Sequence, residues 1–152
     1  MRSLTLALVQ PLMADMSDCA MSGYPDEACG LVVERDGRLN AVCCKNLQNE
    51  LHQRFPDRYT RDARTAYNLD PRAIYEAQES GGVVRAVFHS HPERGAYFSD
   101  EDILSALGGD PNGEPILPGV DYLVLSARAD GIDDAKLFSW DVQTRLFEES
   151  KE

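Results

Sequence analysis

Two histidines separated by one residue, His89 and His91, end a run of apolar and β-branched residues that begins at Val83. Side chains two residues apart lie on the same face of a pleated strand, so both imidazoles could bind one metal ion. Asp102 stands near the start of an apolar helical pattern and could supply a carboxylate as the third ligand. Two nitrogens and one oxygen leave the fourth position of a tetrahedral zinc ion open for water, as in catalytic zinc sites.

Each part of this pattern also has a purely structural explanation. A His-x-His pair on its own more often reflects packing than a metal site. Ser99 and Asp102 precede Ile103 and Leu104, which is typical of a helix N-cap with an acidic residue three positions later. The complete spacing, His-Ser-His-Pro, six residues, Ser, two residues, Asp, is far less common by chance, and it favours a metal site.

This string and a second stretch, Pro25-Asp26-Glu27-Ala28-Cys29-Gly30-Leu31, together resemble the JAMM metalloprotease family, also called the MPN-plus or JAB-domain family. The closest resemblance is to the small, stand-alone prokaryotic branch. It extends to residues 67–71 and to the final strands, so it covers most of the chain. It implies a single JAB/MPN domain over residues 1–152, with an α/β fold similar to that of cytidine deaminases.

The resemblance also implies a role for each residue of the two stretches. His89, His91 and Asp102 would be the ligands of a catalytic Zn²⁺ ion, and Glu27 would be the general acid/base. Zinc lowers the pKa of a bound water toward ~7, so a nearby carboxylate could take its proton at neutral pH. The Ser99 hydroxyl would stabilise the oxyanion of the scissile carbonyl.

Four neighbouring residues complete the interpretation of the motifs. Ser90 lies on the opposite face of the strand by alternation, so we expect it to support the ligands rather than bind the metal. Pro92 is expected to end the strand. Cys29 is expected to be a packing residue, because nothing near it would lower its pKa. Phe98 stands where many relatives in this family have proline, which leaves the shape of the substrate groove open.

Small prokaryotic members of this family process sulfur-carrier proteins, which have ubiquitin-like folds ending in Gly-Gly. The resemblance therefore implies a zinc-dependent peptidase or isopeptidase that hydrolyses the bond after the Gly-Gly tail of such a partner. Two other functions stay open: a metal-free protein-interaction scaffold of the same fold, and a cell-wall or phage-tail peptidase. A zinc deaminase is disfavoured because the chain lacks a Pro-Cys-x-x-Cys string.

Hydropathy period and turn residues predict the elements that would position these residues. The expected strands cover residues 4–9, 30–34, 39–44, 83–92, 122–127, 135–140 and 145–149. The expected helices begin at Pro11, Pro71 and Asp100. Residues 46–66 are polar and are expected to form an irregular surface segment. About three helices would thus flank a mixed, largely antiparallel, curved sheet.

Charge and cysteine content narrow the function further. The chain has 15 Lys and Arg against 26 Asp and Glu, a formal net charge of −11, which disfavours binding to nucleic acid or to an anionic membrane surface. We expect a cytoplasmic location, because no apolar run approaches the roughly 20 residues of a membrane span and the alternating start does not resemble an export signal. The four cysteines contain no Cys-x-x-Cys pair, and we expect all four to be reduced packing residues.

Overall fold

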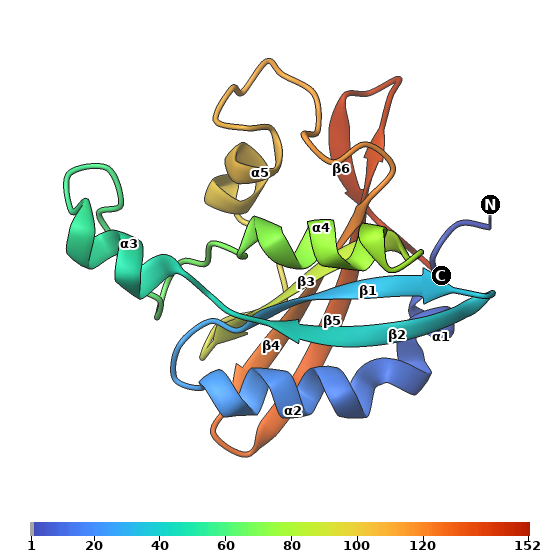
Figure 1. Ribbon diagram of the computed structural model, residues 1–152, viewed down its shortest axis with the longest axis horizontal. Coiled ribbons are helices and arrows are strands. Elements are labelled where there is room, and N and C mark those ends of the chain that lie inside the picture. The colour runs from blue at the N-terminus through green and yellow to red at the C-terminus, as the bar shows by residue number, and fades with distance from the viewer. Residues whose placement is uncertain (1) are drawn as a thin grey trace.

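A six-stranded sheet with the order β2-β1-β3-β4-β5-β6 forms the centre of the computed structural model, which describes residues 2–152 (Figure 1). β3 pairs in parallel with β4, and every other neighbouring pair is antiparallel. The predicted α/β fold with a mixed, largely antiparallel sheet is confirmed. The strands are β1 (Cys29–Arg35), β2 (Arg38–Cys44), β3 (Val83–Pro92), β4 (Asp121–Arg128), β5 (Gly131–Asp141) and β6 (Leu146–Glu149).

Helices cover both faces of the sheet (Figure 1). α2 (Met13–Gly23) lies across one face, and α4 (Pro71–Glu79) and α5 (Asp100–Ala106) lie on the other. Strand alternation divides the apolar residues accordingly, since Val32 and Phe88 pack in the core beneath α2 while Leu31 and Val33 pack in the core beneath α4. No helix among residues 2–152 is long and apolar enough to cross a membrane.

Gly30 allows two strands to approach where the site is built. A Cβ at this position would lie 2.2 Å from Phe88 Cζ and 2.4 Å from the Val42 carbonyl oxygen. Only glycine leaves room for the Phe88 ring to lie over β1. Phe88 is the residue before His89 on β3, so this contact helps to set the position of the first histidine.

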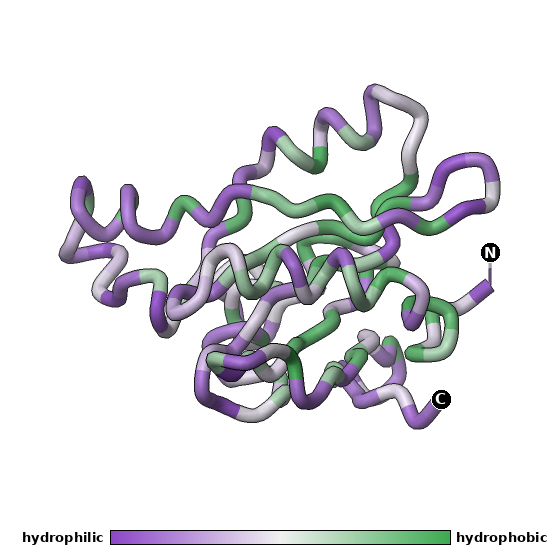
Figure 2. The backbone as a smooth tube through the Cα atoms, turned by 90° about the horizontal axis from the view of Figure 1, so that it is seen from below, coloured by the Kyte–Doolittle hydropathy of each residue, from purple (hydrophilic) through white to green (hydrophobic). Residues whose placement is uncertain are grey.

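Two stretches differ from the sequence-based expectation. Residues 4–9, predicted as a strand, contain the helix α1 (Leu6–Val9), which Thr5 caps by accepting a hydrogen bond from Leu8 N at 3.1 Å. The alternating leucines were misleading because this segment forms no strand of the sheet, and it buries Leu4 and Val9 rather than every second residue. The predicted irregular segment 46–66 contains the helix α3 (Gln48–Arg54), which projects to one side of the molecule and is largely hydrophilic (Figures 1 and 2).

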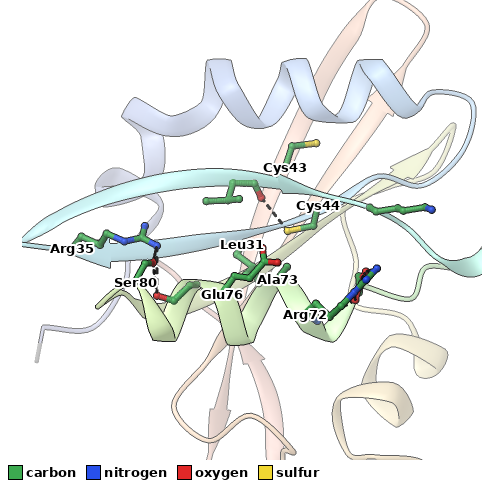
Figure 3. A pocket seen from close by; sticks show the side chains of 12 residues that line it. Leu31, Arg35, Cys43, Cys44, Arg72, Ala73, Glu76 and Ser80 are labelled. Atoms are coloured by element: carbon green, nitrogen blue, oxygen red, sulfur yellow. Dashed lines mark hydrogen bonds and ion pairs between the residues drawn. The ribbon is translucent and has the colours of Figure 1, made fainter.

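The prediction of four reduced cysteines is wrong for one pair. Cys19 of α2 and Cys43 of β2 form a disulfide, whereas Cys29 and Cys44 are free. The two bonded residues are 24 positions apart and meet only because α2 packs across β2, which no local spacing indicates. Cys44 faces α4 while Cys43 points away from it, as side-chain alternation along β2 requires (Figure 3).

Candidate functional site: a metal-binding cluster at the end of β3

The two histidines lie at the end of the strand β3, which is paired on both sides by β1 and β4. His89 is 0% and His91 1% exposed, and their Nε2 atoms are 3.1 Å apart. The predicted alternation therefore places both rings on the face that α5 covers. Tyr67 stacks on the His89 ring with a centroid distance of 4.3 Å, and Tyr97 lies edge-on to His91 at 5.0 Å.

Asp102 brings a carboxylate to the same point from the first turn of α5. Its Oδ2 atom lies 3.1 Å from His89 Nε2 and 3.2 Å from His91 Nε2. Burial opposes ionisation, but the charges of the two histidines and their hydrogen bonds hold the pKa of Asp102 well below its usual range. Ser99 caps this helix, and Ser99 and Asp102 form a capping box, so the structural explanation and the metal site coexist.

The three donor atoms fit a zinc ion. Bonds of about 2.0 to 2.1 Å in a tetrahedral site place ligand atoms ~3.3 Å from one another. The observed separations between the two nitrogens and the Asp102 oxygen are 3.1 to 3.2 Å. His91 Nδ1 lies 2.9 Å from the Gly95 carbonyl oxygen, which fixes the ring so that Nε2 can act as the ligand atom.

Glu27 lies beside this cluster at the start of β1 and is 3% exposed. Its carboxylate belongs to a group with His89 and His91 whose ligand-type atoms all lie within 4.8 Å of one another. Among the described residues, its Oε1 atom has no hydrogen-bond partner. Burial raises the pKa of Glu27, and the nearby positive groups only partly offset this effect. A buried, partnerless carboxylate oxygen beside three metal-type donors is placed to accept a proton.

Arg94 is a site residue that the motif analysis did not identify. Its guanidinium donates to Glu27 Oε2, and its carbonyl oxygen accepts a hydrogen bond from the Ser126 hydroxyl of β4. The ion pair binds one carboxylate oxygen of Glu27 and leaves the other free. In the sequence, only its position two residues after Pro92 could have pointed to Arg94.

The remaining predicted residues lie around the cluster. Ser90 points to the opposite side of β3, where its Oγ accepts a hydrogen bond from Ala28 N at 2.8 Å and so anchors the residue after Glu27. Pro92 is the last residue of β3. Phe98 is buried against Tyr122 and Phe138. Burial raises the pKa of Cys29 to about 12, which agrees with a packing residue.

Two adjoining cavities, which we call the arginine cleft, border the cluster. The smaller has a volume of about 210 Å³, and its lining includes Arg58, Arg61 and Asp102. The larger has a volume of about 520 Å³, shares Arg61 with the first, and is also lined by Arg94 and Ser99. Of the predicted ligand and catalytic residues, Asp102 lines the smaller cavity and Ser99 lines the larger one.

A separate cavity of about 570 Å³ lies between α4 and the β1–β2 hairpin (Figure 3). Leu31 and Ala73 belong to its apolar lining, and Arg35 and Arg72 are among its charged residues. None of the predicted site residues lines it. It is therefore distinct from the group formed by Glu27, His89, His91 and Asp102, which we call the metal-type cluster.

The comparisons with known proteins agree with this fold. Protein structures from Desulfitobacterium hafniense (TM-score 0.60, 22% identity, covering 93% of this chain and 86% of that one) and from Salinibacter ruber (TM-score 0.54, 21% identity, covering 99% and 89%) share its fold. A JAB1/MPN domain protein from Archaeoglobus fulgidus matches at a TM-score of 0.46 and 16% identity, covering 91% of this chain and 90% of that one.

The family comparison extends over most of the chain. No curated protein gives a significant match. The family model described as prokaryotic homologs of the JAB domain matches residues 9–140, which include both motifs and every residue of the metal-type cluster. The chain therefore belongs to the prokaryotic JAB-domain family.

Proposed function

We propose that this protein is a zinc-dependent peptidase that hydrolyses the bond after the Gly-Gly tail of a ubiquitin-like sulfur-carrier protein. The observation that carries the proposal is the free, buried Oε1 atom of Glu27 beside the converging atoms of His89, His91 and Asp102. A purely structural ion-pair cluster would have no need of a carboxylate oxygen without a partner.

Each residue of the cluster has a separate role in the proposed reaction. His89, His91 and Asp102 would hold the zinc ion, which when bound polarises a carbonyl and acidifies a water molecule. Glu27 accepts the proton of the attacking water at Oε1 and returns it to the leaving amine. Arg94 holds the other oxygen of this carboxylate and so orients it.

Ser99 can serve both helix and substrate. Its Oγ accepts the hydrogen bond from Asp102 N at 3.0 Å, so the hydroxyl proton stays available to donate to the developing oxyanion. Ser99 also lines the larger cavity of the arginine cleft, which places the hydroxyl where a substrate carbonyl could approach. On this proposal, the Ser99 side chain both caps α5 and donates a hydrogen bond to the oxyanion.

The substrate class is supported by the family and by the shape of the cleft. A Gly-Gly tail has no side chains and can enter a narrow space where its backbone lies close to the protein. On this proposal the tail would lie in the smaller cavity of the arginine cleft, which has a volume of about 210 Å³ and borders Asp102.

The test uses a ubiquitin-like carrier protein extended by a few residues beyond Gly-Gly. Incubation with the zinc-loaded protein should remove the extension, as measured by mass spectrometry, and Glu27→Gln should lose at least ~10²-fold in rate, the lower end expected for a general acid/base. Bound zinc per chain is measured in parallel. A zinc-free protein that binds the carrier without cutting it would indicate a scaffold, and cleavage of cell-wall peptides alone would indicate the other peptidase class.

A further inference from the structure

The segment between α3 and Tyr67 carries three arginines, of which only Arg64 forms an ion pair among residues 2–152. Arg58 and Arg61 line the arginine cleft, and neither takes part in an ion pair among residues 2–152. In a protein with a net charge of −11, acidic partners for a surface arginine are abundant. Unpaired arginines at the mouth of a cleft are therefore available to a ligand.

Hydrogen bonds connect this segment to α3 and to Glu27. The carbonyl oxygen of Arg61 accepts a hydrogen bond from the buried Gln48 side chain at 2.7 Å. Two residues later, Ala63 accepts one from Glu27 N, also at 2.7 Å. Asn46 bridges the carbonyl oxygens of Glu27 and Ala66 at 2.9 and 3.3 Å. The backbone of Arg61 is thus positioned by the same network that positions Glu27.

Arg61 belongs to both cavities of the arginine cleft. It lines the cavity that reaches Asp102 and also the cavity that contains Arg94 and Ser99. Asp100 and Glu101 line the larger cavity as well, and Glu101 also lines the smaller one, but among the described residues neither forms an ion pair with Arg61. A guanidinium binds a carboxylate through two parallel hydrogen bonds, a geometry that suits a peptide C-terminus.

We propose that Arg61 binds the terminal carboxylate of the segment that leaves after Gly-Gly, so that the enzyme prefers short C-terminal extensions over internal or side-chain-linked bonds. This inference rests on the proposed function and narrows its substrate class. Arg61 acts as a specificity residue, and Arg58 contributes positive charge to the same cleft. Arg61 only binds the carboxylate and takes no part in making or breaking covalent bonds.

The experiment compares a carrier ending in Gly-Gly-Ala with the same carrier ending in the C-terminal amide. Wild type should cleave the free acid about 10- to 100-fold faster in kcat/KM, the range expected for a charged hydrogen bond, and mainly through KM. Arg61→Gln should lower kcat/KM for the acid by that factor and leave the amide unchanged. Arg54→Gln is the control, because Arg54 also forms no ion pair among residues 2–152 and does not line the cleft.

A binding measurement separates this inference from the proposed reaction. Titration of Glu27→Gln with the peptide Gly-Gly-Ala, as acid and as amide, should show the same preference, and Arg61→Gln added to that variant should abolish it. If wild type cleaves neither carrier but the peptide preference depends on Arg61, the proposed hydrolysis is wrong and the carboxylate site stands. Equal cleavage rates for the acid and the amide would overturn the inference. It would also be overturned if a Gly-Gly-Asp peptide with an amidated C-terminus bound as tightly as the Gly-Gly-Ala acid.

Discussion

Gly30→Ala tests how closely the packing of β1 against β3 is coupled to the metal site. The added Cβ would lie 2.2 Å from Phe88 Cζ and 2.4 Å from the Val42 oxygen, whereas ordinary contacts begin at 3.4 Å. The Phe88 ring and the Val42 oxygen must therefore each give way by roughly 1 Å, and the Val42 oxygen is backbone on the paired strand β2. Overpacking of this kind costs about 1 to 3 kcal/mol, and we expect the upper end because a strand has to shift.

Two measurements check this reasoning. Urea unfolding should show the lost stability directly, and zinc affinity should fall by about 10-fold or more, because Phe88 is bonded to His89 and must move with the clash. Gly95→Ala is a stability control, since its new Cβ would meet nothing closer than Tyr97 Cδ1 at 3.6 Å. An unfolding midpoint equal to that of wild type would refute the clash, and an unchanged zinc affinity in a destabilised protein would refute the coupling.

Three further predictions concern stability around the site. Reducing the Cys19–Cys43 disulfide should lower the free energy of unfolding by about 3 kcal/mol, given the 24-residue separation, and urea unfolding of Cys43→Ala should show no response to reductant. Without metal, Glu27→Gln should be more stable than wild type at pH values above the raised pKa of Glu27, because burial raises that pKa and wild type loses stability as pH rises from 4.5 through it. Thermal melts should show this advantage disappearing below pH 4.5, and a difference independent of pH would contradict it. Ser90→Ala should cost about 1 to 3 kcal/mol in urea unfolding, since it removes the acceptor of buried Ala28 N, and a neutral effect would show that water replaces the hydroxyl.

The convergence of His89, His91 and Asp102 could be predicted because two local rules meet at one place. Strand alternation puts the two histidines on one face, and the capping box fixes the carboxylate of Asp102 in the first turn of the next helix. Both rules act over a few residues and leave clear signals in sequence. Glu27 was different, because its position rested on family resemblance and not on any local pattern.

The features that could not be predicted depend on contacts between distant segments. Arg94 pairs with Glu27 across 67 residues, and Cys19 meets Cys43 only through the packing of α2 on β2. The helix α3 has seven residues and one buried side chain, Gln48, so it has no apolar period to detect. Disulfides are rare in the cytoplasm, so this bond counts against the expected cytoplasmic location. Counting free thiols in the protein as isolated would test whether the bond is formed.

The net charge of −11 and the unpaired arginines act at different distances. Exposed charges are screened beyond about 8 to 10 Å at physiological ionic strength, so the acidic surface influences how a carrier approaches, whereas Arg61 acts only on contact. A carrier with a basic face around its tail should therefore be cleaved faster at low salt, and added salt should remove this advantage. The preference of Arg61 for the free acid over the amide should survive the same addition of salt, because it depends on paired hydrogen bonds at short range. If salt abolished both effects together, the arginine cleft would contribute only to the general field of the protein.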